Sequence, residues 1–168
     1  MAKPIFRADL LLDRLAIHGV RFVLIGGFAA QIHGSSILTR DVDICYARDP
    51  SNFDALASAL RSLHATLRGA PPDLPFRLDA KALEKGDAFT FDTDLGALDI
   101  LGTAAADGGR VDYDALLRTA ERVTIGDRPT YVASIDDLMA MKRAAGRPKD
   151  LLGLEVLGAL RDEIDHRR

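Results

Sequence analysis

Two aspartates one residue apart place the strongest constraint on how this chain folds. The run Asp41-Val42-Asp43-Ile44 alternates carboxylates with branched apolar side chains. In a β-strand successive side chains point to opposite faces, so the two aspartates share one face and the two apolar residues share the other. Carboxylates held this close repel each other, and a strand gains no stability from them. A hard divalent cation such as Mg²⁺ would relieve the repulsion, so the pair predicts half of a metal site on a strand over about residues 40–46.

A third aspartate lies in a second apolar strand. Asp99 stands between Leu98 and Ile100 in a strand predicted over residues 97–101. A carboxylate among such neighbours is costly unless it is paired or coordinated. Three carboxylates from two adjacent strands could hold Mg²⁺, with Mn²⁺ as the alternative, orient the phosphates of a nucleoside triphosphate and activate an attacking hydroxyl.

A glycine pair follows the apolar strand predicted over residues 22–25. Gly26 and Gly27 stand between that strand and a short helix predicted over residues 28–33. Glycines at such a turn let backbone N–H groups approach phosphates closely. The pair therefore predicts a triphosphate site, although by itself it also fits a tight turn without a ligand.

The remaining pattern predicts an α/β protein, with a mixed sheet of the α+β kind and helices packed on it. A core is expected over residues 1–104. A C-terminal strand pair and helical segment over residues 105–168 are expected to pack on this core as part of a single compact unit. The other predicted helices cover residues 8–18, 50–64, 79–85, 112–120, 134–146 and 148–165, the other strands cover 88–91, 122–125 and 130–132, and residues 69–77 form a loop.

Composition excludes several classes of protein. The 168 residues are 48% hydrophobic and 28% charged, which suits a folded soluble domain, and the single cysteine excludes an internal disulfide or a cysteine-based zinc site. Aromatic residues make up 6% with no tryptophan, which disfavours a base-stacking surface. The net charge of −3 argues against a generally basic nucleic-acid-binding protein but allows one local basic patch. The N-terminus does not resemble a signal peptide and no apolar run approaches the ~20 residues of a membrane span, so we expect a cytoplasmic protein with no membrane or DNA partner.

A basic cluster stands near the C-terminus. Lys142, Arg143, Arg147 and Lys149 place four positive charges within eight residues of an acidic chain. The cluster predicts contact with phosphates or RNA, and a solvated helix face is the alternative. Arg40, beside the first aspartate, is expected either to contact the substrate or to neutralise the acidic strand.

The combination of Gly26-Gly27, Asp41-Val42-Asp43-Ile44 and Asp99 resembles the signature of the nucleotidyltransferase superfamily related to DNA polymerase beta. The segment from Met141 to Asp150 is similar to the ending of AbiEii/MenT-type nucleotidyltransferases, many of which are toxins of bacterial toxin–antitoxin pairs. The resemblance implies a nucleotidyltransferase fold and transfer of NMP from an NTP to a hydroxyl, with release of pyrophosphate.

The resemblance also implies residue roles. Asp41 and Asp43 would bind metal, and Asp99 would bind metal or act as the general base. Gly26, Gly27 and Ser36 would lie near the triphosphate, and Lys142 and Lys149 would contact its phosphates. Asp150 would orient a lysine or the nucleotide. The candidates for contact with RNA or another acceptor are Arg40, Arg143 and Arg147.

Toxins of this type add nucleotides, often pyrimidines, to the 3′ acceptor end of tRNA, so the resemblance implies tRNA as acceptor and blocked translation and growth as outcome. It also implies an antitoxin partner. Some antitoxins are kinases that modify a hydroxyl residue beside the Asp-x-Asp strand, a position that Thr39 holds here. A phosphate there would add about two negative charges and repel the triphosphate.

Two alternatives to the toxin function stay open. One is the same chemistry on a small molecule such as an aminoglycoside or lincosamide, and the other is a catalytically idle protein of this fold that binds a partner or serves as an antitoxin. The intact set of three repelling aspartates weighs against idleness.

Overall fold

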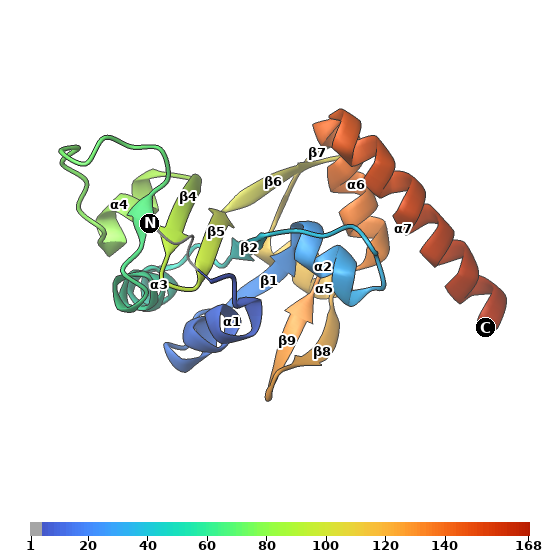
Figure 1. Ribbon diagram of the computed structural model, residues 1–168, viewed down its shortest axis with the longest axis horizontal. Coiled ribbons are helices and arrows are strands. Elements are labelled where there is room, and N and C mark those ends of the chain that lie inside the picture. The colour runs from blue at the N-terminus through green and yellow to red at the C-terminus, as the bar shows by residue number, and fades with distance from the viewer. Residues whose placement is uncertain (1–4) are drawn as a thin grey trace.

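A computed structural model describes residues 5–168, with one mixed sheet between two groups of helices (Figure 1). Within this part of the chain the sheet has seven strands in the order β3-β4-β5-β2-β1-β9-β8, and β6 and β7 form a separate hairpin. The strands are β1 Phe22–Ile25, β2 Asp41–Tyr46, β3 Thr66–Leu67, β4 Ala88–Thr93, β5 Gly96–Leu101, β6 Thr103–Ala106, β7 Gly109–Asp112, β8 Glu121–Ile125 and β9 Arg128–Val132. The helices are α1 Ala8–Ile17, α2 Gly26–Ile32, α3 Pro50–Ser62, α4 Ala80–Lys85, α5 Tyr113–Thr119, α6 Ile135–Ala145 and α7 Pro148–Arg167.

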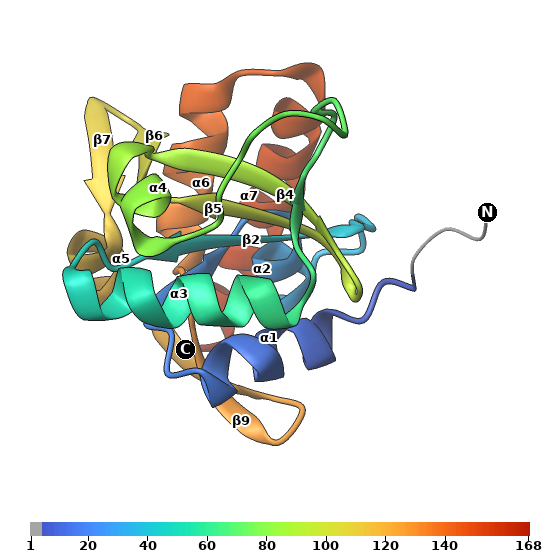
Figure 2. The ribbon, with the colours of Figure 1, turned by 90° about the vertical axis from the view of Figure 1, so that its left-hand side faces the viewer.

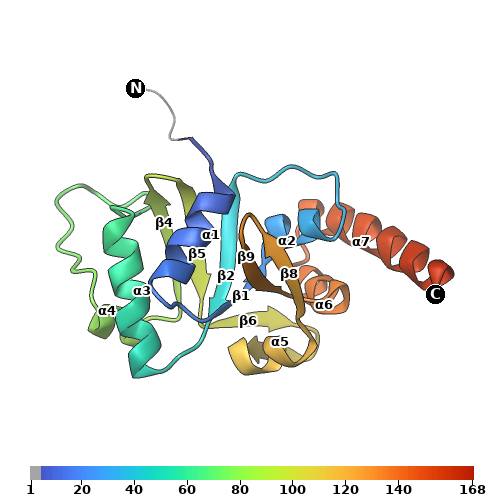
Figure 3. The same cartoon turned by 90° about the horizontal axis from the view of Figure 1, so that it is seen from below.

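The acidic strand β2 lies at the centre of the sheet. It runs antiparallel to β1 and parallel to β5. Val42 and Ile44 are fully buried, as are Leu98 and Ile100, which lie opposite them on β5. Figures 2 and 3 show α1 and α3 side by side on one face of these strands, away from α6 and α7. The alternation of the sequence thus directs the apolar side chains into the core and the aspartates to the opposite face.

Local signals explain where the helices at the site begin and end. The Ser134 hydroxyl accepts a hydrogen bond from the Asp137 backbone N–H and caps α6. Gly146 ends α6 in the left-handed region, with φ of +62°, and Pro148 occupies the first turn of α7. The two helices therefore fold back on each other at one side of the sheet.

The mixed α/β fold class predicted from the sequence is confirmed. The structure differs in detail: α2 begins at Gly26 itself, and β3, β6 and β7 were not predicted because short runs of small or polar residues carry no clear periodicity. The predicted boundary between residues 104 and 105 falls inside β6. The late strand pair is continuous with the main sheet, since Leu24 of β1 pairs with Val132 of β9.

None of the helices in residues 5–168 is long and apolar enough to cross a membrane. Residues 1–4, which belong to the N-terminal segment judged unlike a signal peptide, lie outside the described residues.

Candidate active site

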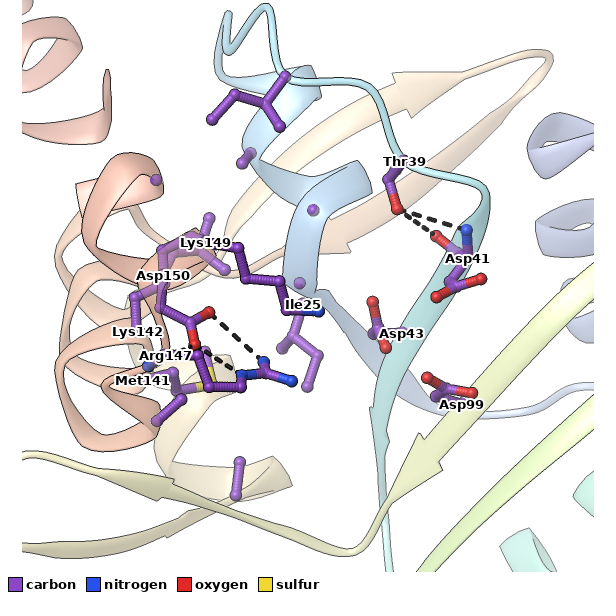
Figure 4. Close-up of a pocket in the computed structure, with 18 of the residues that line it drawn as sticks. Ile25, Thr39, Asp41, Asp43, Asp99, Met141, Lys142, Arg147, Lys149 and Asp150 are labelled. Atoms are coloured by element: carbon purple, nitrogen blue, oxygen red, sulfur yellow. Dashed lines mark hydrogen bonds and ion pairs between the residues drawn. The ribbon is translucent and has the colours of Figure 1, made fainter. Parts of the chain in front are cut away.

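The three aspartates predicted from the sequence lie on one face of two neighbouring strands. Asp43 of β2 is directly opposite Asp99 of β5 in the parallel register, and Asp41 pairs with Ala97 one step earlier on the same face (Figure 4). Strand alternation and register therefore bring Asp99 next to the two aspartates of β2, which are 56 and 58 residues before it in the chain.

The glycine pair lets the start of α2 pack against this acidic strand. Gly26 has φ of +73°, and a Cβ atom there would lie 2.2 Å from Asp43 Oδ2. A Cβ on Gly27 would lie 3.1 Å from the Cβ of Thr39. Both glycines also line the cavity beside the aspartates. The sequence predicted them as a phosphate site, and the structure adds a steric reason for glycine, because any larger residue at position 26 would displace a carboxylate.

Asp43 carries the strongest electrostatic perturbation of the site. Burial, the facing Asp99 carboxylate and the charge of Asp41 raise the pKa of Asp43 from 3.8 to about 7, and the ammonium of Lys149 opposes this rise. The rise reflects negative charges forced together in a partly desolvated place. Such a cluster favours a bound cation, as the sequence pattern predicted.

The carboxylate oxygens suit a hard divalent cation, but the three side chains are not assembled into a cage. Among residues 5–168 no three acidic, histidine or cysteine side chains are grouped closely enough to hold a metal ion. The donor chemistry therefore fits Mg²⁺ or Mn²⁺, with Asp41, Asp43 and Asp99 as the residues that would hold it, provided that the side chains move together.

Sequence reasoning missed Arg68, which contacts the third aspartate. Its Nη2 donates to Asp99 Oδ1 at 2.9 Å and to the Phe91 carbonyl at 2.8 Å, and its Nε donates to Asp92 Oδ1 at 3.2 Å. Arg68 follows the two-residue strand β3, which the sequence pattern did not reveal. Only the pairing of β3 with β4, and of β4 with β5, shows that Arg68 lies near the carboxylates.

Basic side chains from the C-terminal helices form the opposite wall of a cavity of about 420 Å³. Lys142 extends from α6, and Lys149 reaches from α7 toward Asp43 (Figure 4). Gly153 of α7 makes room for Lys142, because a Cβ there would lie 2.9 Å from its Cε and Nζ. The cavity thus has an acidic wall on the sheet and a basic wall on α6 and α7.

Asp150 supports this basic wall through an arginine. The side chain is buried, with 4% of the residue exposed, and its carboxylate accepts hydrogen bonds from the backbone N–H and the Nε of Arg147 at 3.1 and 2.7 Å. Burial raises the pKa of Asp150, but the hydrogen bonds and charge of Arg147 outweigh it and leave the pKa below its ordinary value. The structure shows that Asp150 holds Arg147, and the expectation that it orients a lysine or the nucleotide stays a prediction.

Three residues predicted from the sequence do not line the cavity. Ser36 is exposed, and its neighbour Ser35 lines the cavity instead. Arg40 is exposed outside the cavity lining, and Arg143 forms an ion pair with Asp107 of the β6–β7 turn.

Thr39 does line the cavity, as the phosphorylation hypothesis requires. Its Oγ1 donates to the Asp41 carbonyl at 3.5 Å and accepts from the Asp41 N–H at 3.3 Å.

Known structures resemble the whole chain. The crystal structure of the lincosamide antibiotic adenylyltransferase LnuA with lincomycin bound aligns with a TM-score of 0.62 at 16% identity, covering 94% of this chain and 99% of that one. The antibiotic-resistance factor ANT(2″)-Ia aligns with a TM-score of 0.56 at 14% identity in its solution structure, covering 95% of this chain and 91% of that one. Its crystal structure in complex with adenylyl-2″-tobramycin aligns with a TM-score of 0.55 at 13% identity, covering 94% of each chain.

No protein-family model matches the sequence, and no curated protein is similar to it in sequence. The structural similarity extends over nearly the full length of both chains. The chain therefore has the nucleotidyltransferase fold that its glycine and aspartate motifs predicted.

Proposed function

We propose that this protein is a divalent-cation-dependent nucleotidyltransferase that transfers NMP from an NTP to a hydroxyl group and releases pyrophosphate. The observation that carries the proposal is the pair Asp43 and Asp99 on adjacent strands, facing basic residues across one cavity. A cation held by the aspartates would neutralise charge on the triphosphate and favour ionisation of the attacking hydroxyl.

Residues on the two walls of the cavity would bind the phosphates and accept the proton. Lys142 and Lys149 supply positive charge on the side of the cavity that faces the aspartates, where they would hold the phosphates of the nucleotide. Asp99 lies on β5, on the side of Asp43 toward β4, and its carboxylate could receive the proton of an acceptor hydroxyl bound next to it.

A small hydroxyl-bearing molecule is the acceptor that the site supports best. Two of the four basic residues counted in the sequence are paired with carboxylates, Arg143 with Asp107 and Arg147 with Asp150. This pairing leaves little unpaired positive charge for a nucleic-acid backbone, which an RNA acceptor needs. The fold is also that of two antibiotic-modifying or antibiotic-resistance proteins, which favours an acceptor of that size class.

The 3′ end of tRNA is the second candidate acceptor, with growth inhibition as the outcome. It is favoured by Lys142 and Lys149 at the cavity and by the place of Thr39 on its lining. A phosphate on the Thr39 hydroxyl would add negative charge beside Asp41 and oppose triphosphate binding, so a kinase partner would silence the enzyme.

One labelling experiment tests both candidates. The purified protein is incubated with MgCl₂, each α-³²P-labelled NTP in turn, and either a panel of aminoglycosides and lincosamides or deacylated tRNA. Label on a small molecule supports the first candidate, label at the tRNA 3′ end supports the second, and no label with any acceptor contradicts the proposed transfer and favours a binding role.

Matched variants show whether the label depends on the site. Asp43→Asn removes one carboxylate from the cavity while keeping its shape, and Asp127→Asn removes an exposed carboxylate in the β8–β9 turn. The first is expected to lose transfer by at least about 10²-fold, as for other groups that act only in the transition state, and the second to retain it. Equal activity of the two variants would contradict the assignment of the site.

A further inference from the structure

Arg68 makes a direct contact with Asp99, the third aspartate of the site. The strand register explains how the Arg68 side chain reaches Asp99. The Arg68 N–H donates to the Thr90 carbonyl, Thr90 pairs with Asp99, and Asp99 pairs with Asp43, so all four residues lie in one row across four adjacent segments. The guanidinium spans Thr90 and donates to the carboxylate that faces Asp43.

The Arg68 guanidinium binds two carboxylates at once, and the contact with Asp99 is one of these two ion pairs. Nη2 of Arg68 binds Asp99 while Nε binds Asp92, a more exposed carboxylate on β4. If Nη2 leaves Asp99, the guanidinium therefore keeps a carboxylate partner and does not become a buried unpaired charge. Arg68 is also 33% exposed at its side chain, so water can solvate the freed donor.

Asp99 can offer its Oδ1 either to the Arg68 guanidinium or to a cation shared with Asp43, because both compete for the same lone pairs of that oxygen. The three aspartates are not assembled for a metal in this structure, in which Arg68 binds one of them. We propose that Arg68 is a positioning residue that holds Asp99 in the cation-free site and releases it, while keeping its ion pair with Asp92, when a divalent cation recruits Asp99. This inference rests on the proposed function, because it assumes that the aspartates bind the cation.

The test measures cation affinity directly, without any transfer reaction. The Kd for Mn²⁺ is measured by isothermal titration calorimetry, and free Mn²⁺ by electron paramagnetic resonance, for the wild type and Arg68→Ala. The Arg68–Asp99 pair is partly exposed and so partly screened. Removing this competitor is expected to lower the Kd about five-fold, equivalent to about 1 kcal/mol.

Two controls separate competition at Asp99 from a general effect of charge. Arg77→Ala removes an equal charge outside the cavity lining, at a side chain that is 91% exposed and pairs with Asp79, and it is expected to leave the Kd unchanged. In an Asp99→Asn background, Arg68→Ala should no longer tighten binding, because there is no carboxylate left to release. Circular dichroism of each variant verifies that the fold is intact.

An unchanged or raised Kd in Arg68→Ala would overturn the inference, and so would equal tightening in the Asp99→Asn background, which would indicate electrostatic attraction alone. The proposed function is tested separately by the wild type. Mn²⁺ binding by the wild type with no effect of Arg68→Ala rejects only the role of Arg68, whereas absence of Mn²⁺ binding from every variant rejects the metal site as well.

Discussion

Replacing Asp43 with asparagine is expected to stabilise the cation-free protein at neutral and alkaline pH while removing activity. The pKa of Asp43 rises from 3.8 to about 7 through burial and through repulsion by Asp99 and Asp41. Each pH unit of such a rise corresponds to about 1.4 kcal/mol, so the rise costs the folded protein up to about 4 kcal/mol at pH 8. We therefore expect a gain of about 2–4 kcal/mol from an amide that needs no deprotonation.

The pH dependence follows from the direction of this pKa change. Below pH 4 the carboxyl is protonated in both the folded and the unfolded chain, so Asp43 imposes no cost. Between pH 4 and 7 the unfolded chain releases the proton while the folded chain retains it, and the folded wild type loses relative stability as pH rises. The difference in free energy of unfolding between the wild type and Asp43→Asn should therefore grow from pH 4 to pH 7 and stay constant at higher pH.

Thermal and urea unfolding in EDTA at pH values from 5 to 8.5 would measure the effect. For a chain of this length, 2–4 kcal/mol corresponds to a rise in Tm of about 5–15 °C at pH 8, shrinking toward pH 5. Asp127→Asn, at an exposed turn, serves as the control and should follow the wild type at every pH. Adding Mg²⁺ should raise the Tm of the wild type and reduce the difference in Tm between the wild type and Asp43→Asn. The reasoning would be refuted if Asp43→Asn were no more stable than the wild type at pH 8, or if the difference in stability between them did not depend on pH.

Three further outcomes are expected. Gly26→Ala should lose at least about 2 kcal/mol of stability together with activity, because its Cβ would lie 2.2 Å from Asp43 Oδ2, whereas Gly126→Ala has a similar positive φ but open space and should cost about 1 kcal/mol in urea unfolding. Gly153→Ala should raise the KM for NTP in steady-state assays by displacing Lys142, while Gly158→Ala on the same helix meets only an ordinary contact and should leave KM unchanged. Removing divalent cations with EDTA should abolish transfer of label, and Mn²⁺ or Mg²⁺ should restore it; transfer that persists in EDTA would contradict cation dependence.

Much of the central fold was predictable because its signals are local. The alternation around Asp41 and Asp43 reports a strand with one buried face whatever surrounds it, and the same holds for Asp99 between two apolar residues. Gly146 and Pro148 likewise mark the end of one helix and the start of the next through their own backbone preferences. These elements were predicted close to their observed bounds.

The sequence was less informative about residues whose surroundings depend on distant partners. Arg143 and Arg147 read as available positive charge, but ion pairs with Asp107 and Asp150 engage both of them. The strand β3 is only two residues long and lacks a recognisable period, so nothing in the sequence indicated that Arg68 would lie beside the site.

The sequence by itself therefore determined the chemical groups of this site and the faces of the strands that carry them, because side-chain alternation along one strand requires no knowledge of the rest of the chain. Only the tertiary structure decided which groups meet. The parallel register of β2 and β5 set Asp43 opposite Asp99, and the strand order brought in Arg68 from 31 residues away. Pairing across a sheet depends on contacts between segments far apart in the chain, and the energies of desolvation and charge that perturb Asp43 exist only once those contacts form.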